Sequence, residues 1–224
     1  LEILKLVTNR FSTDVSVLKI VAFKYEELNK LDLAFQVYSM ILKLNPKHSQ
    51  SYRDLSNSLV KLKNYKSSIN RYLNHESTIK KYDSVDFNDS EVGAVMKTEL
   101  ANIIKLHGRK LAVSDKVIDK VIESPNTRLL FEWTNNQAEF EIRIVDTEKN
   151  YYSWKQLRPK NNTIRQFFFD DTFIENKHIQ IVYHGNQTKT PTYLKVTLFY
   201  NYGKHNQISK SAIFKLLEED VNFQ

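Results

Sequence analysis

The chain has 224 residues, of which 41% are hydrophobic and 26% charged, and this composition predicts a globular protein of one or two domains rather than a disordered, collagen-like or coiled-coil chain. It has no cysteine, which excludes disulfides, thiolate nucleophiles and zinc ribbons. The formal charge of +7 is spread along the chain, so no nucleic-acid partner is expected, and no apolar run has the roughly 20 residues of a transmembrane segment.

The first part of the chain has the apolar spacing of paired helices. Residues 1–9 predict one helix, and because the sequence starts inside this pattern we expect a fragment of a larger protein. Residues 15–46 and 49–80 form two units with a period of 34 residues, and each unit is predicted to fold as two helices joined by a turn. Pro46 is expected to end the second helix of the first unit, because proline lacks a backbone donor and clashes with the preceding turn.

Small residues recur where the two helices of each unit must approach closely. Ala22 and Ser56 occupy one equivalent position, and Ala34 and Ser68 occupy another. This pattern resembles the tetratricopeptide family. The second unit departs from the family at Lys80, where the family has proline.

The resemblance to tetratricopeptide repeats implies a groove lined by the first helix of each unit, which holds peptides or partner domains. By the family register, six residues match the groove-facing, partner-binding positions: Lys19, Phe23, Glu26, Arg53, Asn57 and Val60. Phe23 has two interpretations, which the sequence leaves open. It anchors a partner, or it packs on a helix of the preceding unit.

Residues 83–124 are predicted to cap the helical stack and connect it to the next domain. A helix is expected to begin at Asp89 or Ser90 and to end near Leu106, with Gly108 as the residue that stops it. A shorter helix, capped by Ser114, is expected to follow.

From about residue 125 the apolar period becomes two, which is typical of half-buried strands. Phe140, Ile142 and Ile144 fall on one face of such a strand and the charged residues on the other. Seven strands are predicted, at residues 129–133, 139–144, 151–154, 164–169, 179–183, 194–202 and 208–217. Turn signals separate strands at 135–136, 185–186 and 203. Seven short strands in a hundred residues favour an antiparallel β-sandwich.

The predicted fold class is therefore α+β with two domains. Residues 1–82 are expected to form tetratricopeptide-like helical hairpins, residues 83–124 the capping and connecting helices, and residues 125–224 the antiparallel β-sandwich.

Residues 129–146 resemble the opening of an uncharacterised bacterial β-sandwich family, and residues 183–186 and 97–104 are also similar to it. That family follows tetratricopeptide-like helices in large secreted or surface proteins, often downstream of inter-α-trypsin-inhibitor-type and von Willebrand-type domains. The resemblance implies a non-enzymatic interaction or assembly module of an extracytoplasmic protein, whether periplasmic, surface-bound or secreted.

The chain departs from this family at the turn after the first strand. The family carries several aspartates there, a density of oxygen ligands suited to calcium, whereas this chain offers Asn136, Glu139 and Glu141. Two carboxylates and an amide bind calcium weakly, so these three residues are weak metal candidates and neither a metal nor another cofactor is expected.

No catalytic residue is predicted, because the chain has no Gly-x-Ser-x-Gly elbow and no glycine-rich phosphate loop. The best aromatic cluster is at Tyr151, Tyr152 and Trp154. Alternation places Tyr152 and Trp154 on one strand face, which either stacks on sugar rings or belongs to the core. A carbohydrate-binding sandwich is therefore the alternative to a protein-binding module.

Overall fold

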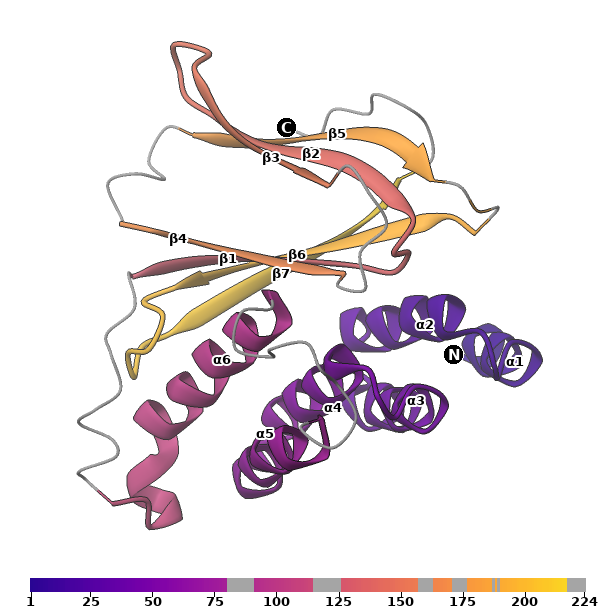
Figure 1. Ribbon diagram of the computed structural model, residues 1–224, viewed down its shortest axis with the longest axis vertical. Helices are drawn as coiled ribbons and strands as arrows, with labels where there is room; N and C mark the ends of the chain where they lie inside the picture. The colour runs from indigo at the N-terminus through magenta and orange to yellow at the C-terminus, as the bar shows by residue number, and fades with distance from the viewer. Residues whose placement is uncertain are drawn as a thin grey trace. The chain divides into compact units, whose positions relative to one another are not determined.

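The computed structural model describes residues 1–79, 91–114, 126–156, 163–170, 177–186, 188 and 190–216 (Figure 1). The chain divides into two compact units, which we call the helical unit (Leu1–Ser124 with Gly203–Asn206) and the sandwich unit (Pro125–Tyr202 with Gln207–Gln224). The predicted fold class, helices followed by an antiparallel β-sandwich, is confirmed.

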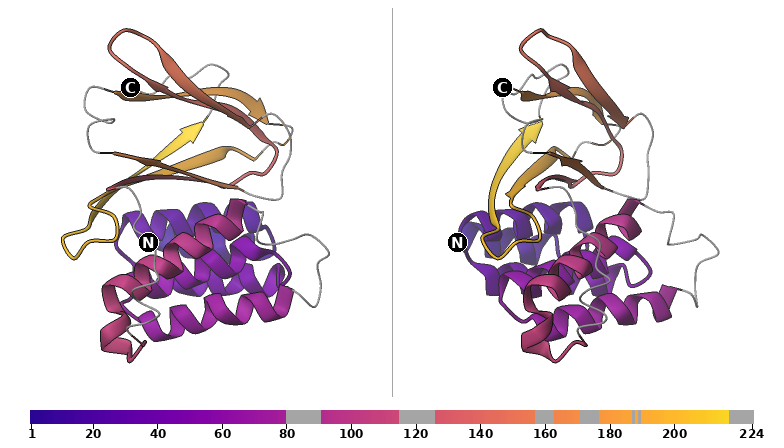
Figure 2. Two further views of the ribbon diagram at one scale, coloured as in Figure 1. Left: turned by 60° about the vertical axis from the view of Figure 1, so that its left-hand side comes forward. Right: turned by 90° about the vertical axis from the view of Figure 1, so that its left-hand side faces the viewer.

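The helical unit consists of paired helices that pack in sequence order. Its described elements are α1 (Glu2–Arg10), α2 (Val15–Glu27), α3 (Leu31–Leu44), α4 (Ser49–Lys61), α5 (Tyr65–Ile79), α6 (Glu91–His107) and the 3₁₀ helix η2 (Gly108–Leu111). α2 packs against α3, α3 against α4 and α4 against α5 (Figure 2). Among the described residues, no helix combines the length and the apolar character needed to cross a membrane.

The 34-residue repeat is visible in the turns that join the helices of each pair. Asn29 ends the first pair's turn with φ 52° and Lys63, 34 positions later, has φ 60°. The next amide donates back into the preceding helix in both turns, from Lys30 to the Tyr25 carbonyl at 2.7 Å and from Asn64 to that of Leu59 at 2.8 Å. The two turns therefore use the same hydrogen bonds to reverse the chain.

The small residues lie between the helices, as the sequence predicts. Ala22, Ala34, Ser56 and Ser68 are all buried, with at most 1% of their surface exposed. The Ser68 hydroxyl donates to the Ser56 carbonyl at 2.9 Å. A larger side chain at any of these positions would force the helix axes apart.

α6 ends at His107, which confirms the predicted helix end near Leu106, but Gly108 is not the left-handed residue that stops the helix. The chain continues from α6 into η2, and the left-handed residue that ends this segment is Ala112, with φ 56°. A local 3₁₀ turn tightens the chain after α6, so no glycine is needed at that point. Three predicted features lie outside the described residues: the helix cap at Asp89 or Ser90, the departure from the repeat family at Lys80, and the helix expected after Ser114.

The sandwich unit has two antiparallel sheets. Its strands are β1 (Thr127–Trp133), β2 (Ala138–Val145), β3 (Tyr151–Gln156), β4 (Ile164–Phe169), β5 (His178–Asn186), β6 (Thr192–Tyr200) and β7 (Ile208–Leu216). One sheet has the order β4-β1-β6-β7 and the other β3-β2-β5. The two sheets lie face to face, as both views of Figure 2 show.

The core of the sandwich forms from alternate residues of the facing strands. Phe140, Ile142 and Ile144 are buried, which confirms the alternation predicted for β2. Phe140 meets Trp133 of the other sheet edge to face, with ring centroids 5.0 Å apart. Aromatic pairs in this geometry contribute about 0.5–1.5 kcal/mol beyond their burial.

The turn predicted at residues 185–186 is wrong, because β5 continues through Asn186. The register between β2 and β5 shifts between Glu139 and Phe140, and Gly185 has φ 102°. Glycine adopts this conformation without strain, so it permits a bulge inside the strand rather than a turn after it.

Candidate functional site

The groove positions on α2 are occupied in contacts to other helices of the helical unit. Lys19 Nζ lies 3.6 Å from Asp54 Oδ2 on α4. Glu26 Oε1 lies 2.6 Å from Lys61 Nζ, also on α4. Phe23 lies between them on α2 and is fully buried. Two ion pairs therefore join the first helices of the two repeats.

The groove positions on α4 divide into one buried charge and two half-buried residues. Arg53 is 1% exposed and donates from Nη1 to Asp54 Oδ1 at 3.1 Å. Asn57 and Val60 are half-buried. Of the six predicted positions, Glu26, Asn57 and Val60 keep part of their surface exposed.

Arg53 is the centre of a buried charge network that joins four helices, α2, α4, α5 and α6. Its guanidinium donates to both carboxylate oxygens of Glu99 on α6, from Nε at 2.9 Å and from Nη2 at 2.5 Å. The Tyr72 hydroxyl on α5 donates to the same carboxylate at 2.8 Å. Together with Lys19 and Asp54, the network contains two positive and two negative charges. This balance permits the charges to be buried, because each has a partner of opposite sign.

The prediction from sequence did not include Glu99, although the sequence contains a signal for it. Glu99 falls within the apolar stripe of α6, three positions after Met96 and four before Ile103, and both of these residues are buried. A carboxylate on the buried face of a helix requires a cation or several donors. The sequence does not identify which of the chain's 33 basic residues supplies this cation, because that depends on how the helices pack.

α1 exposes large apolar side chains beside the ones that make its packing contacts. Leu4 and Val7 pack against the apolar cluster of α2 and α3. Ile3 and Leu6 are 75% and 67% exposed. We call Ile3 and Leu6 together the α1 apolar face. Exposed aliphatic side chains at i and i+3 on one helix form a contiguous surface suited to a partner helix.

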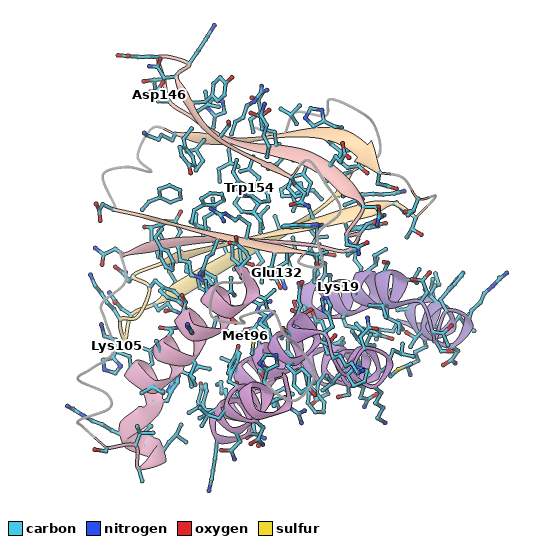
Figure 3. The ribbon with its side chains drawn as sticks, viewed as in Figure 1. Lys19, Met96, Lys105, Glu132, Asp146 and Trp154 are labelled. Atoms are coloured by element: carbon cyan, nitrogen blue, oxygen red, sulfur yellow. The ribbon has the colours of Figure 1, made fainter. Side chains whose placement is uncertain are left out.

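Tyr152 and Trp154 share one face of β3, as alternation predicts, but they differ in exposure. Trp154 lies between the two sheets (Figure 3), where it packs against the core, and the Arg165 guanidinium lies 5.3 Å from its ring centroid. Tyr152 is 57% exposed and meets Phe167 edge to face. Tyr151 points to the opposite strand face, under Arg143. Tyr152 is thus the accessible ring of the predicted sugar-binding pair.

The weak metal candidates lie at the start of β2 and in the turn before it. Asn136 is exposed and Glu139 half-buried. Glu141 is buried and lies 2.9 Å from Arg143 Nη2 and 3.7 Å from Lys155 Nζ. The hydrogen bond from Arg143 is the main reason why the pKa of Glu141 is lower than usual. Across the described ranges, no three His, Cys, Asp or Glu side chains are grouped so as to hold a metal ion.

Sequence comparison adds no relative to this geometry. The chain matches no model of a known protein family, and a search of curated proteins finds no match to it. The candidate sites therefore depend on the contacts described above.

Proposed function

We propose that the chain is a non-enzymatic protein–protein interaction and assembly module that binds a helical segment on the α1 apolar face. The observation that carries the proposal is the exposure of Ile3 and Leu6 on a helix whose Leu4 and Val7 already pack against the helical core. An apolar helix surface that is wider than the contact it makes within the unit leaves apolar area for a further helix to cover. The α1 apolar face is therefore suited to bury a further helix.

The packing chemistry of the helical unit supports this assignment. Stacks of helical repeats grow by burying each helix pair against its neighbour. A partner helix needs apolar residues at i and i+3 or i+4 to match Ile3 and Leu6. Complete burial of each of these two side chains would contribute about 1.5–3 kcal/mol to binding.

The predicted groove makes a smaller contribution in this proposal. Lys19 and Arg53 already bind Asp54 and Glu99, so a ligand that engaged them would have to replace buried ion pairs. The half-buried groove residues Asn57 and Val60 form the part of the groove to which a partner would have access.

A displayed library of helical hairpins, selected for binding to the full chain, tests the proposal. Ile3→Glu/Leu6→Glu should weaken the selected binders at least tenfold in titration calorimetry, because a buried carboxylate lacks a partner there. The matched control is Leu73→Glu on α5, since Leu73 is also an exposed leucine, 53% accessible. Selected binders that respond equally to both variants, or to neither, would contradict binding at α1.

Carbohydrate binding by the sandwich unit is the second candidate, and the exposure of Tyr152 favours it. A glycan array with the full chain tests it. Specific sugar binding that is lost in Tyr152→Ala and in Trp154→Ala would support the candidate. A sugar signal that both variants retain, or no signal, would contradict it.

The bacterial, extracytoplasmic setting and the larger parent protein are also part of the proposal, and they rest on the family resemblance of residues 129–146. Antibody detection of the natural protein in cell fractions tests the compartment. Recovery from the cytoplasmic fraction alone would contradict it.

A further inference from the structure

Among the described residues, the two sheets of the sandwich unit differ in width, with four strands in one and three in the other. Tyr152 and Phe167 bring β3 opposite β4, and Trp133 and Phe140 bring β1 opposite β2. The hydroxyls of Tyr183 on β5 and Thr192 on β6 lie 3.1 Å apart, so β5 lies opposite β6. Within the described strands, β7 therefore extends beyond the edge of the three-stranded sheet.

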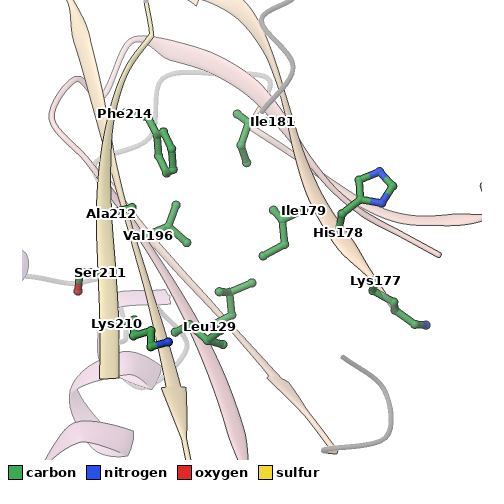
Figure 4. Close-up of a pocket in the computed structure, with 11 residues that line it drawn as sticks. Leu129, Lys177, His178, Ile179, Ile181, Val196, Lys210, Ser211, Ala212 and Phe214 are labelled. Atoms are coloured by element: carbon green, nitrogen blue, oxygen red, sulfur yellow. The ribbon is translucent and has the colours of Figure 1, made fainter. Parts of the chain in front are cut away.

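A cavity of about 440 Å³ opens at this edge, between β5 on one side and β6 and β7 on the other (Figure 4). Its walls are apolar side chains from both sheets: Leu129, Ile179, Ile181, Val196, Leu198 and Phe214. Ala212 contributes only a methyl group to the β7 side. The volume is typical of small-molecule pockets, which range over about 300–1,000 Å³.

Positive charge lies at one end of this cavity. Lys210 shares the inner face of β7 with Ala212 and Phe214, because alternate residues of a strand face the same side. Figure 4 shows the Lys210 ammonium directed toward the end of the cavity beside Leu129. Lys177, the residue before β5, adds a second cation, and none of the described lining residues is acidic.

We infer that this cavity binds a medium-chain fatty acid, with the hydrocarbon chain between the sheets and the carboxylate at Lys210. The apolar walls match the chain, and the cation at the open end matches the single negative charge. The inference is independent of the α1 apolar face, because every lining residue belongs to the sandwich unit.

The inference predicts a specific dependence on chain length. Each methylene group buried in an apolar site strengthens binding by about fourfold. Octanoate, decanoate and dodecanoate should therefore bind with affinities that rise about 15-fold for each two carbons. An ion pair with an exposed lysine contributes less to the binding free energy than burial of the hydrocarbon chain. Lys210→Gln should therefore weaken dodecanoate binding by about two- to fivefold.

Titration calorimetry of the full chain with these three fatty acids, below their micelle-forming concentrations, tests the inference. Ala212→Trp should reduce dodecanoate binding at least tenfold by filling the cavity. Lys210→Gln should weaken dodecanoate but leave dodecanol unchanged. Lys215→Gln removes the same charge from the opposite face of β7 and is the matched control.

Saturable binding with this chain-length dependence and this response to the variants would support the inference. Absence of saturable binding to the wild-type chain would overturn it. Equal weakening by Lys210→Gln and Lys215→Gln would also overturn it, because the carboxylate would then respond to net charge alone. If Ala212→Trp does not fold, the comparison of dodecanoate with dodecanol in Lys210→Gln still shows whether Lys210 binds the carboxylate.

Discussion

Replacement of Arg53 by methionine should strongly destabilise the helical unit. Arg53 is 1% exposed and donates two hydrogen bonds to Glu99, at 2.9 Å and 2.5 Å. Methionine keeps most of the side-chain volume but leaves the buried carboxylate of Glu99 without its guanidinium. Loss of one partner of a buried ion pair costs about 3–5 kcal/mol.

The double variant Arg53→Met/Glu99→Met separates charge from packing. It removes both charges, and Asp54 still has Lys19 at 3.6 Å. Replacement of a buried ion pair by apolar side chains of similar volume is often neutral. The double variant should therefore be more stable than Arg53→Met by roughly 2 kcal/mol or more.

Urea unfolding with two optical signals measures these effects. Circular dichroism at 222 nm follows the helices, and tryptophan fluorescence follows the sandwich unit, because both tryptophans, Trp133 and Trp154, lie in its strands. A loss of 3–5 kcal/mol moves the helical midpoint by on the order of 2 M. Two signals are needed because a chain of two units need not unfold in one step.

Lys24→Met is the matched control, since Lys24 pairs with Glu27 at 2.7 Å but both side chains are exposed by a third or more. An exposed pair contributes at most about 1 kcal/mol. If Arg53→Met costs no more than Lys24→Met, or if the double variant is no more stable than Arg53→Met, the argument from burial is refuted.

Three further predictions concern the turns, the helix contacts and the sandwich. Lys63→Gly should stabilise the helical unit by about 1 kcal/mol in urea unfolding, because Lys63 has φ 60° and glycine adopts this conformation without the cost of a Cβ. Ala22→Leu should destabilise the same unit by about 1–3 kcal/mol by overpacking the contact between α2 and α3, with circular dichroism as the measurement. The hydrogen bond from Arg143 lowers the pKa of Glu141, so the stability that this carboxylate contributes is present above its ordinary pKa of 4.5 and is lost as the pH falls further. Glu141→Gln should therefore flatten the pH dependence of tryptophan-detected unfolding between about pH 5 and pH 3, and an unchanged pH profile would contradict the assignment.

Local patterns in the sequence were sufficient to predict most elements of the fold. Alternation within β2 identified Phe140, Ile142 and Ile144 as a buried face, because a strand places every second residue on the same side. The small residues Ala22 and Ser56 marked the helix contacts, because only small side chains allow close approach. These features depend on residues that are near one another in the chain.

Features that depend on distant residues or on backbone detail were not predictable in the same way. Arg53 and Glu99 are 46 positions apart, and their contact depends on how α4 and α6 pack. Gly185 is followed by Asn186, and this pair is typical of a turn. In the structure Gly185 pairs with β2 and lies in a bulge inside β5. Gly108 follows the end of α6, as predicted, but the chain continues as η2 because a 3₁₀ turn satisfies the same backbone groups.

The helical unit presents two different kinds of surface for a protein partner, and Phe23 tests which one is used. The charged groove positions pair with other residues of the helical unit, whereas Ile3 and Leu6 remain exposed. Phe23 is fully buried, so Phe23→Ala should cost about 3–5 kcal/mol of stability. Binding at α1 predicts that Phe23→Ala retains affinity for the selected helical hairpins at temperatures where it is still folded, while Ile3→Glu/Leu6→Glu loses affinity and remains as stable as the wild type. The reverse result, in which Phe23→Ala loses affinity while folded and the α1 variant keeps it, would assign the contact to the groove.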